Sequence, residues 1–346
     1  MSKDFYSDRN ALNQKKIGVI LNDLPPFVRD YFIGIENRTS PLTRLNYAHD
    51  LRVFFSYLSE TVFIGVPINK ITLKMLDQID SFVFEQFLSY LNSYKTNGKV
   101  KTCNEQAKKR KLASVRSLYK FFYNKDLLNN NTPSKVSLPK IHDKEIIRLE
   151  VNEIVEMLNE AETGENFSEH MKSYHENTKY RDVALLSLFL GTGIRISELV
   201  GLNIEDIDFM TNGFIVTRKG GNRTILYFPD EVGDALYEYV QRRNANPKIP
   251  KTENALFVSL QNKRISVRAV ENLVKKYARI VTPLKRITPH KLRSTYGTNL
   301  YRETGDLYLV ADCLGHKDLN TTRKHYAAIS DDNRRKSANI IKLRKD

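Results

Sequence analysis

Acidic residues are scarce relative to basic ones in this 346-residue chain, with 40 Asp and Glu against 55 Lys and Arg and a formal net charge of +15. This balance favours a polyanionic partner, and DNA, RNA or an acidic membrane would each satisfy it on charge alone. Long apolar runs are also missing. The most apolar one, residues 183–190, is too short to span a bilayer, and the first residues contain no apolar signal core. We therefore expect no membrane association and a cytoplasmic location.

The chain contains only two cysteines. Cys103 and Cys313 lie in different regions of the sequence, which is typical of reduced thiols in a cytosolic protein. The chain also lacks a His-Glu-x-x-His motif, paired zinc-ligand spacing, clustered carboxylates and a phosphate-binding Walker loop. These absences predict a protein that needs neither a metal nor a nucleotide cofactor.

The length of the chain favours two domains. Asn and Pro at 129–133, followed by Pro139, interrupt all periodicity and predict a linker. The predicted order is a loose polar N-terminal arm (1–26), a helical domain (27–130), the linker (131–147), a second domain (148–331) and a basic tail (332–346).

Short apolar stripes predict mainly helices. Ser40 followed by Pro41 is a helix start, and apolar residues then recur at helical spacing up to Leu58. In the second domain, residues 162–179 are polar and are expected to form an irregular insertion loop. Apolar segments around Lys219-Gly220-Gly221-Asn222 predict a hairpin, with 255–259 as a possible third strand. The fold class is therefore mainly α, with a small antiparallel sheet in the C-terminal domain.

Ten Lys or Arg and a single acid, Glu105, occupy residues 95–125. They surround an apolar helical stripe, so this face is either a solvated basic surface or a helix that follows DNA phosphates. The density of one sign favours the second interpretation. The candidate DNA-binding residues, including three outside this segment, are Thr43, Arg44, Lys108, Lys109, Arg110, Lys111, Arg116 and Arg268.

An ordered set of polar residues lies between 290 and 326. His290 and Arg293 are three residues apart and share a helix face, from which guanidinium and imidazole donors can bind a phosphate. Gly315 is a predicted helix C-cap ahead of His316. Tyr326 then offers a hydroxyl that could attack what the others hold. Each residue alone is ordinary, and the order is the signal.

Upstream, Arg195 stands among apolar residues in a Gly-Thr-Gly-Ile-Arg-Ile-Ser-Glu-Leu segment, 191–199. A charge in such surroundings needs a partner. A structural ion pair with Glu198 is one explanation.

This segment together with the 290–326 set resembles the tyrosine recombinases, the phage integrase family, and within them the Xer group. The Thr-Arg-x-x-Tyr of 43–47 and the basic segment at 110–116 resemble the core-binding domain of the same family. One departure concerns spacing, since ten residues instead of the usual nine separate His316 from Tyr326. Because no other tyrosine follows residue 309, Tyr326 is still the predicted nucleophile.

The resemblance implies a helical, SAM-like core-binding domain followed by a catalytic domain. It implies that Glu198 supports Arg195 and that Lys219 is the general acid, although the usual Gly-Lys-Gly is here Arg-Lys-Gly; Arg218 and Arg223 are lesser candidates. The implied catalytic residues are Arg195, Lys219, His290, Arg293, His316 and Tyr326.

The resemblance also implies partners and a reaction. The protein would act as a homo-tetramer on double-stranded DNA with an inverted-repeat site, through a covalent 3′-phosphotyrosine and a Holliday junction. Its tail, 332–346, would dock into a neighbouring subunit. An accessory protein, and the choice between chromosome-dimer resolution, integration or excision, and inversion, are left open.

Two alternatives use the same scaffold. A type IB topoisomerase shares the chemistry, although the separate N-terminal domain and the Xer-like tail argue against it. A DNA-binding regulator without catalytic activity is disfavoured, because all six expected polar groups are present in order.

Overall fold

The computed structural model describes residues 5–96, 98–140, 147–218 and 221–315. The chain divides into two compact units at residues 144 and 145, and each unit is described by itself. The predicted positions Lys219, His316 and Tyr326, and the tail, lie outside the described residues.

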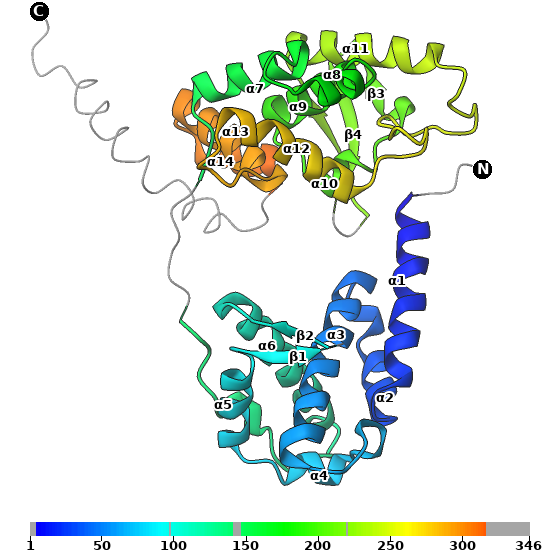
Figure 1. Ribbon diagram of the computed structural model, residues 1–346. Helices are drawn as coiled ribbons and strands as arrows, with labels where there is room; N and C mark the ends of the chain where they lie inside the picture. The colour runs from blue at the N-terminus through cyan, green and yellow to red at the C-terminus, as the bar shows by residue number, and fades with distance from the viewer. Residues whose placement is uncertain (1–4, 97, 141–146, 219–220, 316–346) are drawn as a thin grey trace, which may run out of the picture. The chain divides into compact units, whose positions relative to one another are not determined.

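The N-terminal unit is a helical bundle with a small β-hairpin, in which α1 lies along α3 and α3 packs on α6 (Figure 1). Its helices are α1 (Phe5–Asn22), α2 (Phe27–Gly34), α3 (Pro41–Tyr57), α4 (Leu73–Asp77), α5 (Ser81–Tyr90) and α6 (Glu105–Tyr123). Single helical turns are η1 (Glu36–Arg38), η2 (Leu58–Val62), η3 (Ile68–Lys70) and η4 (Thr132–Lys135). The strands β1 (Tyr94–Thr96) and β2 (Lys99–Lys101) pair antiparallel.

The start of α3 confirms the sequence signal. Ser40 is extended, its hydroxyl accepts a hydrogen bond from the Thr43 backbone N–H at 3.2 Å, and Pro41 occupies the first turn. The apolar stripe that follows is buried throughout, namely Leu45, Ala48, Leu51, Phe55 and Leu58. Local chemistry therefore fixes where α3 begins, and the stripe fixes which face enters the core.

The first 26 residues are not a loose arm, which corrects the prediction. Residues 5–22 form α1, which packs on α3. Ile17, Ile20 and Leu21 are buried on its inner face, and Leu24 is buried just after it. These four buried apolar side chains dock the helix, because their burial offsets the cost of ordering the chain.

The predicted linker, 131–147, also begins too early. Residues 132–135 form a helical turn, and Thr132, Pro133 and Val136 are buried against the N-terminal unit. The guanidinium of Arg116 donates hydrogen bonds to the carbonyls of Pro133, at 3.0 Å, and Val136. The segment up to Val136 therefore belongs to the N-terminal unit.

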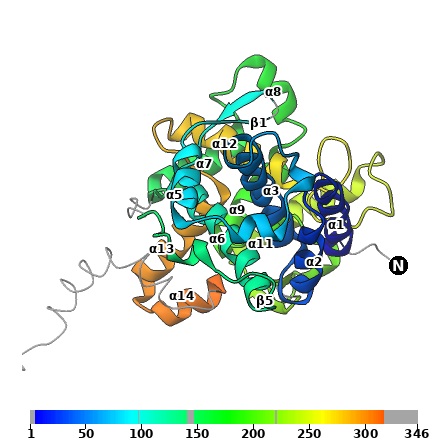
Figure 2. The ribbon, with the colours of Figure 1, turned by 90° about the horizontal axis from the view of Figure 1, so that it is seen from below.

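In the C-terminal unit, α9 lies among α7, α11 and α13, which pack against it (Figure 1). The helices are α7 (Val151–Thr163), α8 (Glu169–His175), α9 (Lys179–Thr192), α10 (Ile196–Leu199), α11 (Asp230–Ala245), α12 (Val267–Val281), α13 (Pro289–Thr304) and α14 (Leu307–Leu314), with a helical turn η5 (Ile204–Asp206). The helices α13 and α14 lie side by side in both views (Figures 1 and 2).

A three-stranded antiparallel sheet, ordered β3 (Ile207–Asp208), β4 (Gly213–Thr217) and β5 (Arg223–Tyr227), completes this unit. The register pairs Thr217 with Arg223, so β4 and β5 form the predicted hairpin. The predicted strand at 255–259 is wrong. Ala255 and Val258 make only isolated bridges, and β3 is the third strand.

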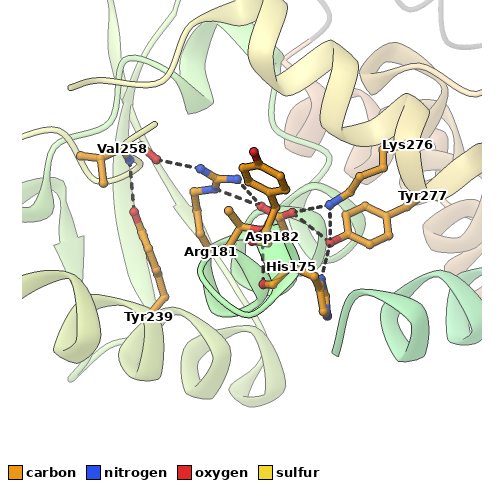
Figure 3. Close-up of polar contacts among 9 residues, drawn as sticks. His175, Arg181, Asp182, Tyr239, Val258, Lys276 and Tyr277 are labelled. Carbon is orange, nitrogen blue, oxygen red and sulfur yellow. Dashed lines mark hydrogen bonds and ion pairs between the residues drawn. The ribbon is translucent and has the colours of Figure 1, made fainter. Parts of the chain in front are cut away.

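The expected irregular loop at 162–179 is also wrong, because it contains α8. His175, at the end of α8, is buried with its Nδ1 3.5 Å from the hydroxyl of Tyr277 in α12 (Figure 3). That hydroxyl donates to buried Asp182 in α9 at 2.9 Å. Lys276 and Arg181 form ion pairs with the same carboxylate, at 3.0 and 2.7 Å. This polar cluster attaches α8 to α9 and α12.

The predicted fold class is confirmed: both units are mainly helical, and the C-terminal unit carries a small antiparallel sheet. Within the described ranges, no helix combines the length and apolar character needed to cross a membrane.

Candidate active site

Arg195 lies where the chain leaves α9 and enters α10. Gly193 ends α9 in the left-handed conformation, with φ of 61°, and turns the backbone toward Arg195. The carboxylate of Glu198 is buried, accepts from the Arg195 guanidinium at 2.8 Å and from the Arg195 backbone N–H at 3.1 Å. The ion pair expected from the sequence is therefore present, and it fixes both the main chain and the side chain of Arg195.

The outer edge of the same guanidinium reaches the far end of α14. Its Nη2 donates to the carbonyl of Leu314 at 3.0 Å and to that of Gly315 at 2.8 Å. The last carbonyls of a helix have no partner within the helix and carry partial negative charge. Arg195 therefore caps α14 from more than a hundred residues away in sequence.

Arg293 converges on the same place from α13. It is buried, and its guanidinium donates to the carbonyl of Gly193 at 2.5 Å and to the carbonyl of Leu314. Leu314 thus accepts from both Arg195 and Arg293. Two guanidinium groups that the sequence places 98 positions apart meet at one carbonyl oxygen, which makes this point the candidate active site.

Gly315 ends α14 with φ of 59°, as predicted for a helix C-cap. A third arginine, Arg218, reaches this end from the hairpin, where its Nη2 lies 3.4 Å from the Asp312 carbonyl oxygen and 3.3 Å from that of Cys313. From the sequence, Arg218 is only a lesser candidate for the general acid. The residue before a lysine on a hairpin carries no signal that it contacts a distant helix.

Two further residues of interest lie on α13. His290 is exposed in the first turn of α13, one turn ahead of buried Arg293. Tyr296 is half-buried on the same helix. Burial, and to a smaller extent the neighbouring Cys313, raises the pKa of its hydroxyl well above the ordinary value. Tyr296 therefore stays protonated at neutral pH.

The structure brings together Arg195, Glu198 and Arg293, and it leaves three predicted residues undescribed. In the sequence, Lys219 directly follows Arg218 and His316 directly follows Gly315. Tyr326 lies ten residues beyond His316 in the sequence.

Two predicted DNA-binding residues are turned inward. Arg44 is buried, and its guanidinium donates to the backbone carbonyls of Glu36 and Thr39 at 2.7 and 2.9 Å and pairs with the Glu36 carboxylate at 3.1 Å. Lys111 is buried against Asp50, at 2.9 Å. We therefore remove Arg44 and Lys111 from the proposed DNA contacts, because their charges are engaged inside the unit.

Asp50 is fully buried in α3 and collects three donors from α6. Besides Lys111, it pairs with Arg110 and accepts from the Ser114 hydroxyl at 3.0 Å. Asp50 and Lys111 are 61 positions apart, and no local sequence pattern predicts their contact. The Arg110 side chain is still 46% exposed, so it can reach outward as well.

The other candidates lie at or near the surface. Lys109 and Arg268 are exposed, and Arg268 makes an ion pair with Glu271 at 3.3 Å. Lys108 donates to the Asn92 side chain, and Thr43 shares a hydrogen bond with Ser40 at 2.9 Å. The partly exposed Arg116 secures the segment before residue 137, as described above. Their contact with DNA stays a prediction.

Comparison with known families accounts for both units. Residues 147–333 match the phage integrase family, and residues 28–126 match the phage integrase N-terminal SAM-like domain.

Relatives of known name support the same assignment. Tyrosine recombinase XerC of Caldanaerobacter subterraneus is 32% identical over 91% of this chain and 86% of its own length. Tyrosine recombinase XerC of Syntrophus aciditrophicus is 31% identical over 87% of this chain and 91% of its own length.

Among solved structures, the XerH site-specific recombinase bound to palindromic difH substrate aligns with a TM-score of 0.63 at 21% identity, over 83% of this chain and 76% of that one. The Tn1549 transposon integrase in complex with circular intermediate DNA aligns with a TM-score of 0.62 at 18% identity, over 86% and 93% of the two chains. These likenesses establish a shared fold. Together with the family matches over both units, they show that this chain belongs to the phage integrase family of tyrosine recombinases.

Proposed function

We propose that this protein is a site-specific DNA recombinase that cleaves and rejoins strands through Tyr326. The observation that carries the proposal is the convergence of Arg195 and Arg293 on the carboxyl end of α14, from which the chain runs directly into His316. Two guanidinium groups fixed by a buried carboxylate and by main-chain carbonyls are preorganised donors for a phosphate.

The proposed step transfers a phosphoryl group of the DNA backbone from the 5′-oxygen to the tyrosine. The Tyr326 hydroxyl gives up its proton to solvent, and its oxygen attacks phosphorus to form a 3′-phosphotyrosine. The bond to the 5′-oxygen breaks, and the departing oxygen takes a proton from Lys219. A tyrosine hydroxyl has a pKa of about 10, so the attack needs help at neutral pH.

That help would come from charge. The transition state gathers negative charge on the non-bridging oxygens, and Arg195, Arg293, His290 and His316 would surround them with donors. Because the phosphodiester is stored on the tyrosine, rejoining needs no nucleotide. The proposed chemistry also needs no metal.

The substrate and assembly follow the same proposal. Double-stranded DNA with an inverted-repeat site would hold two subunits, and two such duplexes would hold a homo-tetramer that exchanges strands through a Holliday junction. Lys108, Lys109 and Arg110 on the N-terminal unit and Arg268 on the C-terminal unit would contact DNA phosphates. The tail, 332–346, would connect neighbouring subunits.

The test uses a nicked suicide substrate, which traps the covalent adduct because the cleaved end diffuses away. Wild-type protein should form an adduct whose phosphorylated residue maps to Tyr326, at similar rates with EDTA or magnesium. Tyr326→Phe should bind the same DNA with unchanged affinity and form no adduct.

An adduct of undiminished yield in Tyr326→Phe, or one that maps to Tyr301 or Tyr308, would overturn the assignment. Binding without any wild-type adduct would support the regulator. Relaxation of plasmids that lack a target site would support the topoisomerase.

A further inference from the structure

Arg218 directly follows strand β4 in the hairpin, and its side chain extends to α14. Its backbone closes the hairpin, since its N–H donates to the Asn222 carbonyl at 2.8 Å and its carbonyl accepts from the Gly221 N–H at 3.0 Å. Its side chain lies against the carbonyl oxygens of Asp312 and Cys313 at 3.4 and 3.3 Å. One residue therefore belongs to the hairpin by its main chain and to the end of α14 by its guanidinium.

Gly315 makes room for this guanidinium. A Cβ placed on Gly315 would lie 2.2 Å from Arg218 Nη1 and 2.5 Å from Cζ, closer than any real contact. The positive φ of 59° also disfavours other residues at this position. The contact is thus close packing between a side chain and bare backbone. Arg218 Nε is buried there, with no hydrogen-bond partner among the described residues.

The same helical end holds the two arginines of the proposed phosphate site. Carbonyls 312 and 313 face Arg218, while Leu314 and Gly315 accept from Arg195, and Leu314 also accepts from Arg293. Three guanidinium groups therefore share four successive carbonyls. Like charges repel, and this repulsion is offset by the partial negative charge of the helix end and by the Glu198 carboxylate that pairs with Arg195.

We propose that Arg218 is a positioning residue for the phosphate site, which rests on the function proposed above. By holding the last turn of α14, it sets where the Leu314 and Gly315 carbonyls stand, and these carbonyls orient Arg195 and Arg293. Arg218 therefore acts through the arginine pair, and its loss affects charge stabilisation at phosphorus more than the proton that Lys219 delivers.

The test measures single-turnover cleavage by Arg218→Ala on two suicide substrates, one normal and one with sulfur in place of the bridging 5′-oxygen. Sulfur leaves without a proton, because a thiol pKa is about 8.5. The variant should cleave about tenfold more slowly on both substrates, which corresponds to about 1.4 kcal/mol. Lys219→Ala should be slow on normal DNA alone.

Double variants identify the partner. Arg218→Ala combined with Arg293→Ala should be little slower than Arg293→Ala alone, because both changes remove one unit of function. Combined with Lys219→Ala on normal DNA, its effect should multiply. Arg242→Ala, which removes one charge from an exposed pair with Glu238 on α11, is the control and should cleave at the wild-type rate.

Rescue of Arg218→Ala by sulfur would overturn the inference, since Arg218 would then act through the hairpin tip. So would multiplication with Arg293→Ala, or a lowered melting temperature with an unchanged cleavage rate. Should Arg218→Ala fold poorly, Arg218→Lys keeps the charge and loses the two-pronged donor, and it should be slow on both substrates. The nucleophile assignment is tested separately by Tyr326→Phe, so its failure leaves the coupling of Arg218 to Arg293 measurable on whichever residue carries the adduct.

Discussion

Two groups of basic side chains are held in opposite ways. In the N-terminal unit, Arg110 and Lys111 meet the fully buried carboxylate of Asp50. At the end of α14, Arg218 and Arg293 meet main-chain carbonyls, which are neutral acceptors. The first arrangement neutralises one of the two positive charges inside the unit and stabilises the fold. The second directs charge without cancelling it, so the site keeps positive potential for an anion.

Arg195 stands between these cases. One edge of its guanidinium pairs with Glu198, and the other edge faces the Leu314 and Gly315 carbonyls. The carboxylate fixes the side chain while the remaining edge is oriented by dipoles. The Glu198 carboxylate therefore holds Arg195 in place while part of its guanidinium faces the helix end.

The largest effect should come from removing the buried acid. Asp50→Ala leaves Lys111 buried without its countercharge, and such a change costs about 3–5 kcal/mol of unfolding free energy. Chemical denaturation of the protein would measure it. Adding Lys111→Met should recover most of the loss, because both charges are then gone. If the two substitutions simply add, the pair does not behave as a compensated unit.

Arg293→Ala should show the opposite balance. It removes a donor from the proposed phosphate site, so cleavage should fall by about 10²–10³-fold, as when an oxyanion donor is deleted. DNA binding should change much less. Arg302→Ala is the matched control, since Arg302 lies on the same helix and pairs with Glu150 at 3.4 Å. Equal loss of cleavage in both variants would contradict the distinction between directed and cancelled charge.

A smaller effect concerns the Asp182 cluster, where positive partners again surround an acid. Burial, with the charge of Lys276 adding to it, lowers the pKa of His175 below its ordinary value of 6.5. The unfolded chain then binds the proton first, so this stability is present above pH 6.5 and is lost as pH falls toward the folded pKa.

Melting temperatures measured at about pH 7.5 and about pH 5.5 would test this linkage. His175→Gln should lose less stability on acidification than the wild type. His170→Gln, an exposed histidine on the same helix, should behave as the wild type does. Identical pH dependence in all three proteins would show that α8 does not report the protonation of His175.

The smallest effect should come from the exposed Lys109, which lies two positions before the buried Lys111. Lys109→Ala should leave stability unchanged and weaken DNA binding uniformly, with the slope of log affinity against log salt reduced by about 0.9 if Lys109 neutralises one phosphate. Titration at several salt concentrations would measure this slope. An unchanged slope would place Lys109 outside the interface.

Local signals in the sequence predicted a large part of this structure. The Ser40 hydroxyl accepts from a backbone N–H group at the start of α3, and Gly315 ends α14 in the left-handed conformation. These features depend on a few neighbouring residues, which is why sequence reasoning finds them. The meeting of Arg195 with Arg293 came from the resemblance to a family, and the structure supplies the carbonyls that hold them.

The failures share one cause, since each depends on a distant partner. Lys111 reads as one more cation on a basic face, and only Asp50, 61 positions away, turns it inward. His175 reads as part of a polar loop until Tyr277 and Asp182 surround it. Tertiary contacts determine whether these side chains are buried, and the residue spacing along the chain does not predict such contacts.

The docking of α1 has a practical consequence for anyone who prepares the N-terminal unit as a fragment. The match to the SAM-like family begins at residue 28, beyond Ile17, Ile20, Leu21 and Leu24, which are buried. A fragment cut at that boundary would expose the apolar surface of α3 that these side chains cover. The lost burial free energy is about 1.5–3 kcal/mol for each fully buried side chain. Contiguous apolar surface of this kind promotes self-association. A soluble fragment should therefore start no later than Phe5.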